Sequence, residues 1–241
     1  MDLVNGETAM ATFGLIPGAC HGAWCWDRLV PELTARGHKA IAVELPGDDP
    51  TAGFARYVGV ASEALGGAGE DLVLVPHSLG AHTAVRLATA SPPRGIVFVC
   101  GVIPPRAGED DHDEPEMEAP GTFDTLALDD LGRFSFPDAT DAVNAFFHDC
   151  DPETAAWAAS RLRPQSRTPH AELGDLVGPP GVPTVSIVCT DDRVASADWG
   201  RWAARERLLG APVVELPGSH SPFLSRPALL ADALVGALAH L

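Results

Sequence analysis

The chain has 241 residues, a formal net charge of −17 and 46% hydrophobic residues, which suits one α/β unit with a substantial core. The acidic excess argues against a nucleic-acid partner, because phosphate binding requires clustered lysine and arginine. No run of about 18 uninterrupted apolar residues occurs, so a membrane span is not expected.

The first residues and the cysteines bear on the cellular compartment. The first seven residues lack the basic start and the apolar block of a secretion signal. The five cysteines are scattered, odd in number and without the paired spacing of a zinc site. They are Cys20, Cys25, Cys100, Cys150 and Cys189. We therefore expect a cytoplasmic protein with reduced thiols and no bound metal.

Apolar runs rich in valine and isoleucine alternate with longer segments of helical periodicity. The runs predict strands at residues 11–16, 39–45, 71–75, 95–101, 183–190 and 212–216. Helices are predicted between them, including one at about residues 54–65 and one that begins at Pro227. Such alternation is typical of a mainly parallel sheet covered on both faces. We predict an α/β fold with about six or more strands.

One interval breaks this rhythm. About eighty residues separate the fourth and fifth predicted strands, far more than the usual connection of about 4–6 residues. We predict a helical cap insertion at about residues 102–182 within a single domain of residues 1–241. Its acidic run at 109–118, with His112, is interpreted as a solvated loop rather than a cation site. Six aromatic residues could line a pocket beneath the cap, although most could equally pack the cap itself: Phe123, Phe134, Phe136, Phe146, Phe147 and Trp157.

The third predicted strand ends in His77-Ser78-Leu79-Gly80 and leads into an alanine-rich helix. A serine on such a strand-to-helix turn can project its hydroxyl from the sheet edge as a nucleophile. The alternative is that Ser78 only caps a buried helix, since serine is a favoured N-cap residue.

Acidic and histidine residues follow the last two predicted strands. Asp191 and Asp192 come after residues 183–190, and His220 comes after residues 212–216. Taken singly, the aspartates could form a turn and the histidine could be an ordinary loop residue. The order serine, aspartate, histidine, each at a strand end, instead favours a catalytic triad.

The first predicted strand runs into a glycine-containing loop at residues 15–24. A loop of this kind can turn a main-chain N–H toward the oxygen of an attacked carbonyl. The N–H groups of Ala19 and Leu79 are thus the expected oxyanion hole. The alternative, a plain strand-to-helix turn, explains the glycines but not their combination with the other three loops.

Over about residues 11–240 the chain resembles the α/β-hydrolase superfamily, in its compact branch of small esterases, plant methyl-ester hydrolases and hydroxynitrile lyases. The motifs that carry the resemblance are PGACHGAWCW, VELPG, PHSLG, TDDRV and PGSHSPFLSRP. It implies Ser78 as nucleophile, His220 as general base and Asp192 as the acid that orients it, with no cofactor. Four neighbouring residues are expected to contact substrate: Gly18, His21, His77 and Ser221.

Two positions depart from the family pattern. Pro76 stands where the nucleophile turn normally has glycine, and Pro17 stands where relatives often carry histidine. Lyases of this branch place a lysine after the catalytic histidine and a threonine in the oxyanion loop. Here these places hold Ser221 and Gly18, which favours hydrolysis of a small, fairly apolar ester, thioester or lactone. A lyase or cyclase on the same scaffold and a receptor-like binding module stay open, as does the oligomeric state.

Overall fold

The computed structural model describes residues 10–106, 113–175 and 180–241. Its centre is a six-stranded, wholly parallel sheet in the order β2-β1-β3-β4-β8-β9. The strands are β1 (Thr12–Ile16), β2 (Lys39–Ala42), β3 (Leu72–Pro76), β4 (Gly95–Val99), β8 (Thr184–Cys189) and β9 (Val213–Leu216). The predicted fold class is confirmed, with every strand of this central sheet inside a predicted run or within one residue of it.

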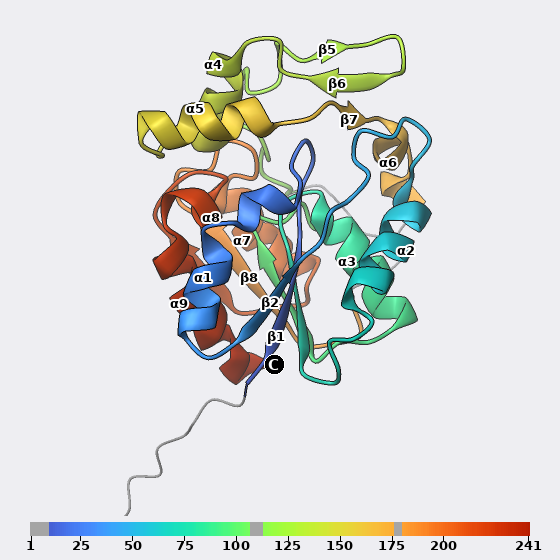
Figure 1. Cartoon of the computed structure of the whole chain (residues 1–241), viewed down its shortest axis with the longest axis vertical. Helices are drawn as coiled ribbons and strands as arrows, with labels where there is room; N and C mark the ends of the chain where they lie inside the picture. The colour runs from blue at the N-terminus through green and yellow to red at the C-terminus, as the bar shows by residue number, and fades with distance from the viewer. Residues whose placement is uncertain (1–9, 107–112, 176–179) are drawn as a thin grey trace, which may run out of the picture.

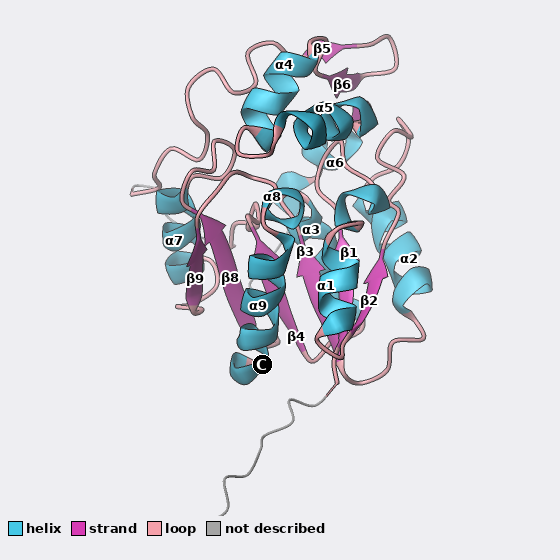
Figure 2. Ribbon diagram, turned by 60° about the vertical axis from the view of Figure 1, so that its left-hand side comes forward, coloured by secondary structure: helices cyan, strands magenta, loops and turns pink. Residues whose placement is uncertain are grey.

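Helices cover both faces of this sheet (Figure 2). Side chains of successive strand residues point to opposite faces, so Phe13 and Leu15 pack in one core and Ile16 in the other. The first core includes α1 (Leu29–Ala35), α8 (Pro222–Ser225) and α9 (Pro227–Ala237), and the second includes α2 (Phe54–Leu65), α3 (Gly80–Ala90) and α7 (Ala197–Glu206). Eight of the eleven residues of α3 are buried, as expected for a helix that follows a central strand.

The segment between β4 and β8 lies over the carboxyl ends of the strands (Figure 1). It contains α4 (Ala139–Ala142), which continues into a π-helical turn at Val143–Phe147, then α5 (Pro152–Arg161) and α6 (Thr168–Ala171). It also contains a small antiparallel sheet of β5 (Ala127–Leu128), β6 (Arg133–Ser135) and β7 (Gln165–Ser166). We call this segment the cap. Helices were expected in this segment, whereas its small sheet was not predicted.

Some sequence-based expectations lie outside the described residues. These are the absence of a secretion signal in the first seven residues and the interpretation of His112 and its acidic neighbours up to residue 112. Within the described ranges, no helix combines the length and apolar character needed to cross a bilayer. All five cysteines have free thiols, as the sequence predicted.

Candidate active site

Ser78 lies on the tight turn between β3 and α3. Its backbone has φ +49°, a left-handed conformation that non-glycine residues rarely adopt. The turn is held by main-chain hydrogen bonds from Gly80 N to His77 O (2.8 Å) and from Ser78 N to Val99 O (3.3 Å). Strained backbone of this kind concentrates at functional sites, and here it turns the serine toward the carboxyl edge of the sheet.

Two glycines allow the turn to pack against the loop after β1. A Cβ atom on Gly80 would lie 2.7 Å from the main-chain oxygen of Pro17, and one on Gly18 would lie 2.7 Å from the Cβ of Ser78. Neither contact is sterically possible, so both positions require glycine. The loop therefore approaches Ser78 closely because neither glycine has a side chain.

Pro76 is accommodated at the end of β3. The β3–β4 ladder pairs Val73 with Gly95 and Leu74 with Ile96, and pairing resumes only at His77 with Val99. The interruption spans Val75 and Pro76, and proline has no N–H to donate. The proline thus ends the strand without preventing the turn at Ser78.

Asp192 and His220 meet at the same edge, as the strand-end positions predicted. The Nδ1–H of His220 donates to Oδ2 of Asp192 over 2.8 Å, and both side chains are buried. Oδ1 of Asp192 accepts from the N–H groups of Val194 (2.8 Å) and Ala195 (3.0 Å). The carboxylate therefore holds one histidine tautomer, and Nε2 of His220 is left as a buried acceptor without a hydrogen bond to any described residue.

Asp191 has a different place. Its side chain is exposed, and Oδ2 accepts from Gly218 N (3.1 Å) and from the hydroxyl of Thr190 (2.9 Å). These bonds join the loop after β8 to the loop after β9. Of the two adjacent acids, only Asp192 contacts the histidine.

The loop after β1 presents the amide of Ala19. Ala19 and Leu79 both line the cavity described below, and neither N–H donates to another described residue. The carbonyl of Ala19 accepts from Nδ1–H of His21 over 2.7 Å. Burial lowers the pKa of His21 to about 4, so its ring is neutral at physiological pH.

A cavity of about 390 Å³ lies between the cap and the sheet edge. Its walls are largely apolar, and none of the described residues that line it is lysine or arginine. They are Ala19, Cys20, His21, Ser78, Leu79, Val102, Met117, Glu118, Phe123, Leu126, Phe134, Phe136, Phe146, His170, Leu173, Val194 and His220. Four of the six predicted aromatic residues are present, whereas Phe147 and Trp157 pack elsewhere. A volume of this size is typical of a small-molecule site.

Two of the residues predicted to contact substrate do not line this cavity. His77 is 1% exposed and Ser221 is 0% exposed, and neither lines the cavity. His77 precedes Ser78 and Ser221 follows His220 in the chain, but the side chains of both are buried in the protein interior. His21 does line the cavity, and Gly18 lines a small adjoining crevice and lies against Ser78.

Among the described residues, Cys100 is the further group placed where it could bind a metal ion together with Asp192 and His220. Its thiol, the Asp192 carboxylate and a ring nitrogen of His220 lie within 4.8 Å of one another. Hydrogen bonding with Cys189 and burial raise the pKa of Cys100 well above its usual range, so the thiol stays protonated. A protonated thiol is a poor metal ligand, and the other two groups already bond to each other.

A sequence model of the Alpha/beta hydrolase family matches residues 15–233. The chain belongs to this family. Among its relatives, methylesterase 2 of Arabidopsis thaliana is 28% identical over 258 aligned residues, which cover 96% of this chain and 97% of the relative. The pyrethroid hydrolase of Sphingobium wenxiniae is 27% identical, with 91% of this chain and 85% of the relative covered.

Solved structures resemble this chain over nearly its whole length. The pyrethroid hydrolase from Sphingobium faniae JZ-2 has a TM-score of 0.79 at 25% identity, with 95% of this chain and 98% of that chain covered. Polyneuridine aldehyde esterase has a TM-score of 0.78 at 21% identity, with 94% and 98% covered, and shows the shared fold. The resemblance to the small-esterase branch is thereby confirmed.

Proposed function

We propose that this chain is a carboxylic-ester hydrolase that acts through Ser78, His220 and Asp192. The observation that carries the proposal is the buried hydrogen bond of 2.8 Å between His220 Nδ1 and Asp192 Oδ2, at the wall of a cavity that Ser78 also lines. The esterase and pyrethroid hydrolase names of the relatives support the same reaction class.

The tautomer of His220 gives each group its role. With Nδ1–H bound to Asp192, the lone pair on Nε2 can accept the proton of Ser78 as the serine oxygen attacks an ester carbonyl. The tetrahedral intermediate collapses when the bond to the alcohol oxygen breaks, and His220 returns the proton to that oxygen. Water then attacks the acyl-enzyme by the same route, which releases the carboxylic acid and restores Ser78.

The N–H groups of Ala19 and Leu79 would stabilise the oxygen that becomes negative in each tetrahedral intermediate. Both line the cavity beside Ser78, and neither donates to another described residue. Removing a single donor of this kind typically lowers kcat by about 10²–10³-fold. Main-chain donors also cost no reorganisation during the reaction.

The cavity favours a neutral, apolar acyl group of small to medium size. Aromatic rings from the cap form much of the wall, and among the described lining residues Glu118 is the one acid. Partial burial raises the pKa of the Glu118 carboxyl above its usual value. An anionic acyl group would therefore meet repulsion and no cationic partner.

A cytoplasmic location remains a prediction that cell fractionation would test.

A panel of aryl esters of increasing acyl length, with matched methyl esters and lactones, tests the proposed reaction. We expect a burst of coloured alcohol equal to the enzyme concentration, followed by steady turnover. Ser78→Ala should abolish the burst and lower kcat by several orders of magnitude without changing the thermal unfolding midpoint. A serine-directed fluorophosphonate should label Ser78.

Three results would exclude the proposal. Saturable binding of these esters without turnover would indicate a binding module, and turnover that consumes no water would indicate a lyase or cyclase. Normal activity of the Ser78→Ala variant would remove the serine from the mechanism.

A further inference from the structure

Cys20 sits in the oxyanion loop in a conformation that needs support. Its φ is +63°, in the left-handed region that non-glycine residues rarely occupy. Both of its main-chain groups bond to one short segment of the cap. The Cys20 N–H donates to Oε1 of Gln165 over 3.2 Å, and the Cys20 carbonyl accepts from Arg163 N over 2.9 Å. The cap thus holds this strained residue from both sides.

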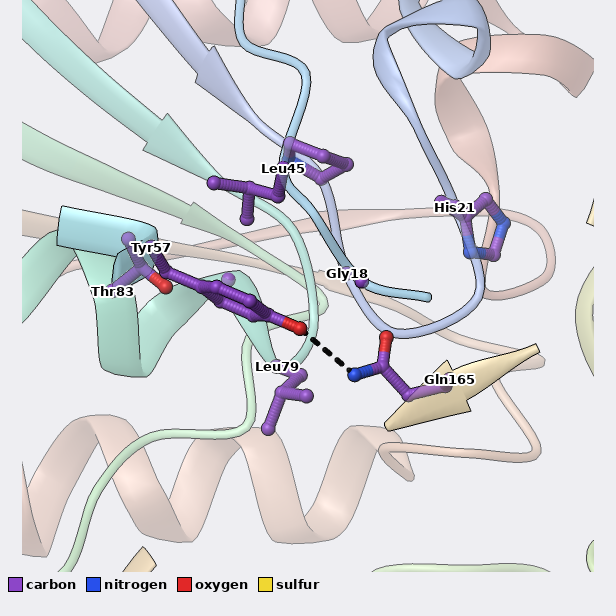
Figure 3. Close-up of a pocket in the computed structure, with 10 residues that line it drawn as sticks. Gly18, His21, Leu45, Tyr57, Leu79, Thr83 and Gln165 are labelled. Atoms are coloured by element: carbon purple, nitrogen blue, oxygen red, sulfur yellow. Dashed lines mark hydrogen bonds between the residues drawn. The ribbon is translucent and has the colours of Figure 1, made fainter. Parts of the chain in front are cut away.

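Gln165 is itself fixed in orientation. It is 2% exposed, and its Nε2 donates to the hydroxyl of Tyr57 (3.0 Å) and to the carbonyl of Ser166 (3.1 Å). Figure 3 shows the bond to Tyr57 and the side-chain oxygen of Gln165 directed toward the loop that carries Gly18. Since both donors of the amide point away from the loop, its oxygen is the atom left for the Cys20 N–H.

The bonds around Cys20 determine where the neighbouring amide points. The Gly18 carbonyl accepts from His21 N (3.3 Å), and the Ala19 carbonyl accepts from the His21 ring (2.7 Å). Cys20 is held by the cap. The Ala19 N–H, between these bonded groups, is left for a ligand in the cavity.

We propose that Gln165 is a positioning residue for the oxyanion hole, acting from the cap through the main chain of Cys20. This inference rests on the proposed esterase function. Strained backbone persists only where the surrounding structure holds it. When the Gln165 bond is lost, Cys20 can relax and carry the Ala19 N–H away from the position of the developing oxyanion. Substrate binding in the cavity, which does not include Gln165 in its wall, should change little.

Gln165→Leu removes the bond, and Gln165→Glu retains an oxygen of the same shape for the Cys20 N–H. Thr168→Val is the matched control, because the Thr168 hydroxyl bonds the cap to Pro50 O (2.8 Å) without contacting the oxyanion loop. We expect Gln165→Leu to lower kcat by about tenfold or more, a part of the full effect of one lost donor, with KM within about twofold. Affinity for a trifluoromethyl ketone, which forms a tetrahedral adduct with serine, should fall by the same factor. Gln165→Glu should recover a part of both kcat and inhibitor affinity, because it keeps the acceptor for the Cys20 N–H but loses the donors to Tyr57 and Ser166. Thr168→Val should change neither quantity.

Two further measurements make the result decisive. Tyr57→Phe removes the partner of Gln165 and should give a smaller loss in the same direction, which covers the case in which Gln165→Leu does not fold. Hydrogen exchange of the Cys20 amide should be faster in Gln165→Leu than in Thr168→Val, whether or not esters are turned over.

The inference is overturned if Gln165→Leu retains wild-type kcat and inhibitor affinity, even with a lowered melting temperature. Equal exchange rates at Cys20 in the two variants would overturn it as well. Failure of the wild-type chain to hydrolyse any ester would instead refute the proposed function, and the exchange measurement would still decide whether the cap holds Cys20.

Discussion

Nε2 of His77 donates a hydrogen bond of 2.9 Å to the main-chain carbonyl of His220. The two rings lie 4.5 Å apart, and the His77 ring also packs edge-on against Phe223 at 4.8 Å. Burial lowers the pKa of His77 well below its usual value, so the ring stays neutral and keeps this single donor. The residue that precedes the proposed nucleophile therefore holds the backbone of the proposed base.

His77 does not line the substrate cavity, but its replacement should impair catalysis through the position of His220. His77→Phe keeps an aromatic ring but loses the donor, and we expect kcat to fall about tenfold because general base catalysis depends on the placement of His220. His77→Gln can donate to the same carbonyl and should recover part of the loss. Steady-state kinetics with one aryl ester measure both variants. A His77→Phe enzyme with unchanged kcat would show that the loop after β9 holds His220 without this bond.

The adjacent aspartates provide a matched pair. Asp192→Asn should lower kcat by about 10³–10⁴-fold, because an amide in that place favours the wrong tautomer of His220. Asp191→Asn keeps an acceptor oxygen for Gly218 N and should cost about tenfold or less, as it only joins two loops. Kinetics of the two variants side by side test the ranking, and the reverse order would reassign the orienting acid.

Much of this arrangement could be predicted from sequence because parallel strands place their carboxyl ends at one edge. Runs of valine and isoleucine located the strands, and the residues that follow them had to meet. The helix at Phe54–Leu65 was predicted with its observed bounds, since apolar residues recur there at helical spacing. The sheet of the cap escaped prediction because its strands have only two or three residues, too few for a two-residue alternation to be detected.

Contacts between distant residues could not be predicted in the same way. Gln165 lies 145 residues from Cys20, and no local pattern marks an amide side chain as a partner for a particular main-chain N–H. His77 and Ser221 were expected at the cavity only because they adjoin Ser78 and His220. Neighbours in a turn or strand end point in different directions, so adjacency in sequence does not place a side chain in the same cavity.

Charge selectivity should depend on Glu118. Glu118→Gln should raise kcat/KM several-fold for an aryl ester with an anionic acyl group, because it removes a like charge from the cavity wall. A neutral ester of the same shape should change little. Glu116→Gln, an exposed acid outside the cavity wall, is the control. High salt should reduce the effect by screening. Equal gains for the neutral and the anionic ester would contradict a charge effect.

Buried histidines should make the fold sensitive to acid. Burial lowers the pKa of His21 to about 4 and of His82 to about 3, whereas a histidine in the unfolded chain titrates near about 6.5. Below pH about 6.5 the unfolded state binds more protons, so the free energy of unfolding falls as pH drops toward 4 and 3.

Urea unfolding at pH about 7.5 and about 5 measures this dependence, to which each such histidine contributes up to about 1.4 kcal/mol per pH unit. His82 stacks on Phe54 and does not line the cavity, so His82→Gln removes one buried histidine without altering the site. Its stability should therefore depend less steeply on pH than that of the wild type. An unchanged slope would mean that His82 is not a source of the acid sensitivity.

Pro76 bears on the conformational entropy of the nucleophile turn. The pyrrolidine ring fixes φ in the unfolded chain as well as in the folded one, so this residue loses little backbone freedom when the protein folds. Two residues later the chain must enter the left-handed conformation of Ser78, whose strain is of the order of 1–3 kcal/mol. A glycine at position 76 would add its own large loss of freedom to that strain. The proline therefore restricts the unfolded ensemble just before the strained serine and offsets part of the free energy needed to hold it there.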